Sequence, residues 1–555
     1  MKKTVLVTSV ILTATLFLSA CGGASPAAGT GDAPAAGAGS GGGTTAGLSG
    51  DEGELRIALN ADIVSMDVHR NTNDYLIPMN VFDTLFTVEK NADGSSSIVK
   101  SLVDDYSISD DGLTYSFTLR DGVVFSDGTP LTADDVKFTF ERILTLPDSQ
   151  QTDYAISIKG AQDLLDKKAD ELSGITVQDD THFTITLAEP FSGFLAQLAT
   201  PSTSIFSRSL VNEAGEDFGI DPQKTIGTGP YIITSWEQGS GMTLEYNPRY
   251  WGSEPSVKKV TAKIMDPATM DMAFQKGDID ILDCLFLDSA IVDSVYKQKY
   301  ADSIVSVDRL GMNYFILNEK IGPLSDVSVR KAIQMAVDRQ SILDSIYSGD
   351  GKLEDGIFPS GCLSYSTDNQ GWLKYDPEGA KKLLSDAGYP NGFDMEVSLD
   401  SSAAETAKRA LEIIAQNLQD VGINASIRSY DRASYLDLRN GGNMNSYLAL
   451  WLLDYNDPDN VIYTFFGSRS NTVIRSNNYP DENVIGRIGD ARFIVDNDKR
   501  MQEYAALEKK LVQDDAVWVP LYSLKHLFVK GERVASFTPQ WAGWSDMYFS
   551  GVELK

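Results

Sequence analysis

The most informative part of this sequence is an apolar run that ends at an acid, Leu450-Trp451-Leu452-Leu453-Asp454-Tyr455-Asn456-Asp457-Pro458-Asp459-Asn460. With the three residues before it, the run from Tyr447 to Leu453 is almost wholly apolar, which predicts a buried strand. The Asn-Asp-Pro-Asp-Asn segment that follows predicts a turn, because Asx side chains bond to nearby backbone and Pro458 fixes φ. The strand therefore ends at Asp454.

Asp454 has two interpretations. The commoner role of an Asp at such a position is to form a turn or cap a helix. The alternative is a desolvated anion whose partner is the ammonium group of a ligand, because a buried charge without a partner is costly. The residues around Asp454 leave both interpretations open.

Trp451-x-x-Asp454-Tyr455-Asn456-Asp457-Pro458 resembles the Trp-x-x-Asp-Tyr-x-(Asp/Glu)-Pro motif of oligopeptide- and dipeptide-binding proteins of ABC importers, bacterial extracellular solute-binding protein family 5. Further segments resemble this family in order, from about residue 54 to 555: 112–120, 125–136, 227–231, 246–252, 325–339 and 375–390. The resemblance implies that Asp454 holds the α-amino group of a peptide. It also implies an α/β, two-lobed, periplasmic-binding-protein-like (type II) fold with an extra β-rich subdomain in the first lobe.

Local patterns agree with this α/β organisation. Leu113 to Leu119 alternates like a half-buried strand, and Thr132-x-x-Asp135 matches a capping box. A helix is expected from Asp326 to the stop at Gly349, and another where Asp376-Pro377 supplies a cap and a first-turn proline. The expected boundaries are lobe 1 at 51–85, 225–308 and 516–555, the β-rich subdomain at 86–224, and lobe 2 at 309–515.

The first 50 residues predict a lipid-anchored, extracytoplasmic protein. Residues 1–20 have a basic start and an apolar run too short to span a bilayer, which is typical of a signal peptide. Leu18-Ser19-Ala20-Cys21 resembles a lipobox, so Cys21 is expected to carry the lipid; the alternative is an ordinary cleavage site with an incidental Cys. The Gly- and Ala-rich remainder of 21–50 predicts a flexible tether.

Charge and composition exclude several classes of protein. The formal net charge of −31 makes nucleic acid an unfavourable partner. The three His residues show no metal-ligand spacing, and no phosphate-loop, nucleophile-elbow or zinc-protease motif occurs, so neither a metal, a cofactor nor an enzyme is expected. Whether Cys284 and Cys362 pair stays open.

The candidate ligand contacts extend outward from Asp454. Backbone atoms of Leu450, Trp451 and Leu452 are expected to bond to ligand backbone, as when a peptide adds to a sheet edge. Trp451 is either a core residue or the cover of a side-chain pocket. Further candidates are Tyr314 and Arg309, where the chain is expected to enter lobe 2, and, by resemblance, the loop from His69 to Asn73.

Leu448 stands where some peptide-binding relatives carry an Arg, so the partner of a ligand carboxylate and the ligand length stay open. The favoured function is a monomeric binding protein that delivers oligopeptides to an ABC permease with separate ATPase subunits. The alternatives are the same fold binding an oligosaccharide or a nickel chelate, a partner of a membrane sensor, and a surface hydrolase.

Overall fold

The computed structural model describes residues 53–71, 75–90, 96–539 and 547–555. The predicted signal peptide, Cys21 and the tether lie outside the described residues. None of the described helices combines the length and the apolar character that a bilayer crossing requires.

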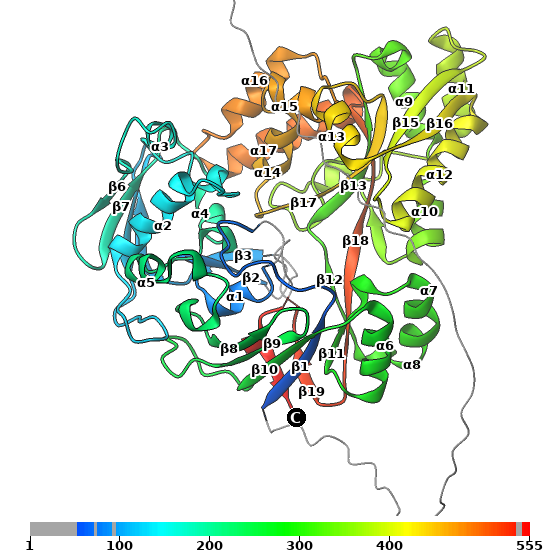
Figure 1. Ribbon diagram of the computed structural model, residues 1–555. Helices are drawn as coiled ribbons and strands as arrows, with labels where there is room; N and C mark the ends of the chain where they lie inside the picture. The colour runs from blue at the N-terminus through cyan, green and yellow to red at the C-terminus, as the bar shows by residue number, and fades with distance from the viewer. Residues whose placement is uncertain (1–52, 72–74, 91–95, 540–546) are drawn as a thin grey trace, which may run out of the picture. The chain divides into compact units, whose positions relative to one another are not determined.

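Two sheets share one long strand, β18 (Trp518–Lys530). The first sheet also contains β8 (Tyr231–Glu237), β9 (Gly241–Tyr246), β10 (Lys259–Ile264), β1 (Glu54–Leu59), β11 (Ile281–Asp283) and β12 (Ile304–Asp308). The second also contains β13 (Gly311–Leu317), β14 (Gly351–Leu353), β15 (Phe393–Asp400), β16 (Ile423–Tyr430) and β17 (Ser446–Leu452). Figure 1 shows β18 running from one group of strands to the other.

The two halves of β18 have different partners. Residues 518–522 pair with β13 and residues 525–529 with β12, both antiparallel. Between these halves the chain crosses from β12 to β13, where the Arg309 amide donates to the Leu524 carbonyl over 3.0 Å. Two extended segments therefore join the sheets. The predicted domain boundaries, including the one at 515/516, stay predictions.

The segment between β1 and β8 contains sheets of its own and is called here the β-rich unit. A four-stranded sheet runs in the order β4 (Val103–Ile108), β5 (Thr114–Leu119), β7 (His182–Thr186), β6 (Ile175–Val177), and β2 (Phe86–Lys90) pairs with β3 (Ser96–Lys100). Its helices are α1 (Pro78–Val81), α2 (Ala133–Thr145), α3 (Ala161–Leu165), α4 (Phe194–Gln197) and α5 (Arg208–Ala214). The capping box predicted at Thr132 and Asp135 is present at the start of α2.

The remaining helices lie along the rest of the chain. They are α6 (Pro267–Lys276), α7 (Ser289–Ile291), α8 (Lys297–Lys299), α9 (Val327–Ala336), α10 (Arg339–Tyr347), α11 (Pro377–Asp386), α12 (Glu405–Asp420), α13 (Arg432–Asn440), α14 (Asp459–Phe466), α15 (Arg469–Ile474), α16 (Glu482–Ala491) and α17 (Asn497–Lys509). Near the C-terminus, β19 (Val534–Phe537) pairs with β20 (Val552–Leu554).

Two local expectations can be compared directly with these helices. The cap predicted at Asp376 is confirmed, since its side chain accepts from the Gly379 amide at the start of α11. The single helix expected from Asp326 to Gly349 is wrong. Asp338 accepts from the Ser341 amide and starts a second helix, so α9 and α10 are separate.

Candidate ligand-binding site

The apolar run around Trp451 forms β17, and one of its edges is largely unpaired. β17 pairs with β13 along its whole length, from Ser446 to Leu452. On its other side, its printed pairing within the described chain is a single position, Tyr447 opposite Ser398 of β15. The later residues of β17 therefore present a free edge to which an extended chain could add.

The hydrogen-bond alternation identifies which residues face that edge. The Leu453 amide donates to Leu310 over 2.9 Å, and Trp451 lies opposite Met312 in the same register. Alternate residues of an antiparallel pair exchange bonds. Trp451 therefore directs its backbone toward β13, whereas Leu450 and Leu452 direct theirs toward the free edge.

The prediction of a wholly buried strand was wrong in the middle of β17. Tyr447 and Leu453 are buried, but the Leu450 side chain is 47% exposed. Leu450 lies in the part of β17 that has no recorded partner strand on its second side. The exposure agrees with a strand that borders a binding surface.

Asp454 follows β17 and is both exposed and close to much of the surrounding protein. Its side chain is accessible to solvent, yet surrounding protein raises its pKa, chiefly by burial. Both properties are expected of a group on the wall of a hollow. Asn460 donates to its carboxylate over 3.0 Å, and no described Lys, Arg or His forms an ion pair with it.

The two acids that follow in the same stretch are ion-paired. Asp457 receives two hydrogen bonds from Arg500, at 2.9 and 2.5 Å, and both side chains are almost fully buried. Asp459 lies 3.0 Å from Arg492. These pairs hold the predicted turn between β17 and α14 and leave Asp454 as the acid of the stretch without a cation.

Residues from the β-rich unit come close to Asp454. The pKa of Tyr154 is raised well above its usual value by burial and then by the negative charge of Asp454. The Tyr154 ring lies 6.5 Å from that of Tyr455. The carboxylate of Asp153 further raises the pKa of Asp454. Negative potential therefore collects here, which favours a cationic ligand group.

Trp451 connects Asp454 to an arginine. Its indole Nε1 donates to Asn460 over 3.0 Å, and the same Asn460 donates to Asp454. The guanidinium of Arg475 lies 5.0 Å from the centre of the Trp451 ring, which is partly exposed. The sequence did not reveal Arg475, because no motif marks it. Asn460 ends the stretch 450–460, but the sequence pattern predicted no role for its side chain.

Two of the other predicted contacts, Tyr314 and His69, have buried side chains. Tyr314 is 1% exposed and packs against Trp518 at 4.2 Å, because β13 lies between β17 and β18. His69 is fully buried against Phe206, and Arg142 donates to its ring, so its side chain is not on a cleft surface. Arg309 lies in the crossing between β12 and β13. Asn73 is outside the described residues.

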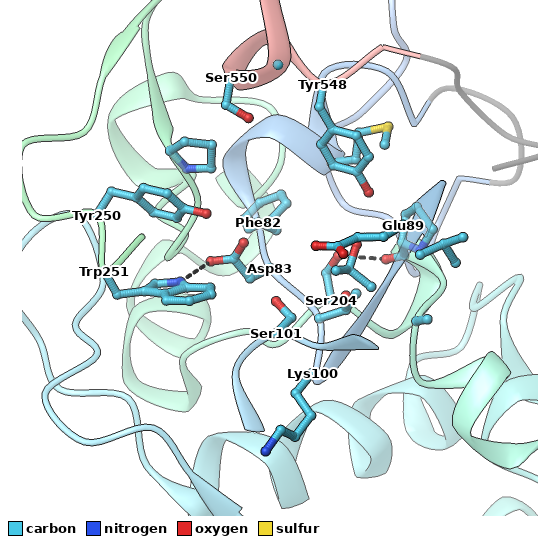
Figure 2. Close-up of a pocket in the computed structure, with 18 residues that line it drawn as sticks. Phe82, Asp83, Glu89, Lys100, Ser101, Ser204, Tyr250, Trp251, Tyr548 and Ser550 are labelled. Atoms are coloured by element: carbon cyan, nitrogen blue, oxygen red, sulfur yellow. Dashed lines mark hydrogen bonds between the residues drawn. The ribbon is translucent and has the colours of Figure 1, made fainter. Parts of the chain in front are cut away.

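A hollow of about 330 Å³ is lined mainly by residues of the β-rich unit, of the loop between β9 and β10, and of the segment before β20. Figure 2 shows Asp83 between Trp251, Tyr250 and Tyr548. Burial raises the pKa of Asp83 to about 6, and Trp251 and Thr228 donate to its carboxylate at 2.8 and 2.9 Å. Asp83 thus has partners of its own, unlike Asp454.

Cys284 and Cys362, which sequence left undecided, are both free and buried. Burial raises the pKa of each thiol to about 12, so neither is a reactive thiolate at neutral pH. Within the described parts of the chain, no cluster of three or more His, Cys, Asp or Glu could hold a metal ion.

Comparison with known proteins identifies the family. The chain matches the model of bacterial extracellular solute-binding proteins, family 5 Middle, over residues 97–472. This chain belongs to solute-binding protein family 5.

Family relatives cover most of the chain. It is 26% identical over 490 residues to the probable D,D-dipeptide-binding periplasmic protein DdpA of Escherichia coli (strain K12), covering 87% of this chain and 91% of that protein. It is 28% identical over 482 residues to heme-binding protein A of Haemophilus influenzae (strain ATCC 51907 / DSM 11121 / KW20 / Rd), covering 83% and 85%.

Solved structures establish the fold. The unliganded open form of the periplasmic murein tripeptide binding protein MppA has a TM-score of 0.77 at 22% identity, covering 91% of this chain and 98% of that one. The predicted two-lobed, periplasmic-binding-protein-like α/β fold is confirmed. The family's members act outside the cytoplasm.

Proposed function

We propose that this protein captures oligopeptides between its two lobes and delivers them, without catalysis, to an ABC permease with separate ATPase subunits. The observation that carries the proposal is Asp454, an accessible carboxylate without an ion-pair partner at the end of an unpaired strand edge. The carboxylate suits the α-ammonium of a peptide, and the Leu450 and Leu452 backbone suits the peptide's own backbone. The name of the D,D-dipeptide-binding relative agrees with this ligand class.

Two further features of the proposal come from the sequence. Cys21 carries a lipid that holds the protein at the extracytoplasmic face of the membrane, and residues 22–50 form the tether. The mature protein acts as a monomer. The intact mass of the protein extracted from membranes tests the anchor: an N-terminal Cys21 without added lipid mass would contradict it.

The test of the peptide site compares a free tripeptide with its N-acetylated form by calorimetry. Losing one partner of a desolvated charge pair costs about 2–5 kcal/mol, so we expect Asp454→Ala and Asp454→Asn to bind the free tripeptide roughly 30- to several thousand-fold more weakly. Acetylation should weaken binding to the wild type for the same reason, because it removes the cation.

Asp431→Asn is a matched control. Asp431 is an acid of the second sheet's lobe that caps α13, and Asn caps a helix equally well. If Asp454 were only a turn residue, Asp454→Asn would behave like Asp431→Asn. Equal affinities for free and acetylated tripeptide in all these proteins would contradict the peptide proposal and favour an uncharged solute such as an oligosaccharide.

A further inference from the structure

Arg475 is a cation that the described chain leaves without an anion. It follows α15, and its guanidinium lies 5.0 Å from the ring centre of Trp451 and 5.1 Å from that of Phe465. Its side chain makes no hydrogen bond or ion pair with a described residue, and its buried Nε has no partner. In a chain with 78 acidic residues, an arginine at this depth without one is unusual.

Two other arginines of the protein differ from Arg475, because each forms an ion pair with an aspartate. Arg500 is paired with Asp457, and Arg492 with Asp459. Both pairs come from the same turn that follows β17. Arg475 stacks on Trp451 before this turn and on Phe465 after it, but no described acid forms an ion pair with it. Ring stacking alone leaves its hydrogen-bond donors unused.

The surroundings of Arg475 make an added anion favourable. Burial lowers its pKa, and the positive charge of Arg439 acts in the same direction. The Tyr447 hydroxyl donates to the Arg475 carbonyl over 2.8 Å, which fixes the backbone that carries the guanidinium. The buried hydroxyl of Tyr314 has no hydrogen-bond partner among the described residues either.

Arg475 and Asp454 lie around the same indole. Asp454 is connected to Trp451 through Asn460, and Arg475 stacks on the Trp451 ring. Each charge acts favourably on the other, but they do not form an ion pair. A ligand with opposite charges at its two ends could neutralise both groups while lying along Trp451.

We propose that Arg475 forms an anion subsite that binds the α-carboxylate of a short peptide whose α-ammonium lies on Asp454. This inference rests on the proposed function and deepens it, because it assigns the second end of the ligand. Since both charges flank one tryptophan, the ligand is a dipeptide or tripeptide, which spans about 7–11 Å at ~3.3–3.6 Å per residue.

The test uses an equimolar mixture of Ala-Xaa-Ala tripeptides, prepared once as free acids and once as C-terminal amides, with affinities measured by calorimetry. Hydrogen bonds to a charged group support roughly a 10- to 150-fold preference of the wild type for the free acids. In Arg475→Gln this ratio should fall to about one, because amides lose nothing when the guanidinium is removed. Arg475→Lys keeps the charge and should retain part of the preference.

Arg428→Gln is the matched control, since Arg428 also stacks on a ring, 5.1 Å from Tyr430, but on an exposed surface of the same lobe. It should keep the wild-type ratio. If Arg475→Gln weakened acids and amides equally, Arg475 would serve only to pack Trp451 and the inference would be wrong. The same holds if the wild type did not distinguish acids from amides.

The same measurements distinguish failure of the Arg475 subsite from failure of the proposed peptide-binding function. If N-acetylation abolished binding but amidation changed nothing, the peptide function would stand and only the Arg475 subsite would be rejected. If no tripeptide bound the wild type, both would be rejected. Because the acid-to-amide ratio is also measured in the wild type, the test holds even where Arg475→Gln fails to fold.

Discussion

At the scale of single residues, one stretch contains three aspartates with two different roles. Asp457 and Asp459 are buried and paired with Arg500 and Arg492, whereas Asp454 is accessible and forms no ion pair with a described residue. Residue type alone could not separate them, because each partner lies more than 30 positions away in the sequence. The resemblance to the family motif was the signal that pointed to Asp454.

These roles predict opposite effects on stability. Burial raises the pKa of Asp454 above its usual value, so its charged form destabilises the ligand-free fold as pH rises above about 3.8. Asp454→Asn should therefore melt higher than the wild type at pH 7, and the difference should shrink toward pH 4. Asp457→Asn should melt lower, since leaving Arg500 buried without its anion costs about 3–5 kcal/mol.

Thermal melts of the ligand-free proteins at pH 4 and pH 7 check this prediction. Asp431→Asn serves again as the neutral comparison, because its carboxylate caps α13 on the surface. An Asp454→Asn variant that melts below the wild type at pH 7 would indicate that Asp454 has a structural role in the turn.

At the scale of elements, the register of β17 decides which of its backbone groups can form the proposed ligand surface. The apolar composition of residues 447–453 correctly predicted a strand but did not show that its second half lacks a neighbour. β15 meets β17 at only one position, and this arrangement exposes the Leu450 side chain and frees alternate backbone groups. Sequence also could not place the break between α9 and α10, since Asp338 caps a helix within a continuous apolar stripe.

This register predicts that two neighbouring prolines have different effects. Leu450→Pro removes an amide that faces the free edge, so we expect weaker tripeptide binding, by roughly 5- to 10-fold for one lost hydrogen bond, with little loss of stability. Ala449→Pro removes an amide that faces β13 and should destabilise the fold instead.

Calorimetry for affinity and thermal melts for stability separate the two variants. Full binding by Leu450→Pro would exclude the β17 edge from ligand recognition. A stable Ala449→Pro variant would show that the assigned alternation of hydrogen bonds is incorrect.

At the scale of the whole molecule, the crossing segments suggest a hinge. β12 continues into β13 while β18 runs back beside them, and β14 pairs with β18 at the same place, from Tyr522 to Leu524. The pairing of β13 with β18 is irregular between Asn313 and Tyr314. Because a small number of extended segments connects the lobes, one lobe can rotate against the other.

We expect a bound tripeptide to close the lobes. Small-angle scattering should show a smaller radius of gyration at saturating tripeptide, and at 100 times its Kd the ligand should stabilise the fold by about 2.7 kcal/mol, seen as a higher Tm. Asp454→Asn at the same peptide concentration should be stabilised by at most about 0.9 kcal/mol, because its Kd is expected to be at least 30-fold higher, and its radius of gyration should shrink less. A scattering profile of the wild type that is identical with and without bound tripeptide would contradict hinge closure.

The sequence by itself determined the family, the α/β class, the turn after β17 and the caps at Thr132 and Asp376, because these depend on residues close together in the chain. Only the tertiary structure decided which side chains share the site. It buried His69 and Tyr314, paired Asp457 and Asp459, and brought Arg475 onto Trp451. Burial and charge pairing depend on contacts between distant segments, so the local pattern of residues could not reveal them.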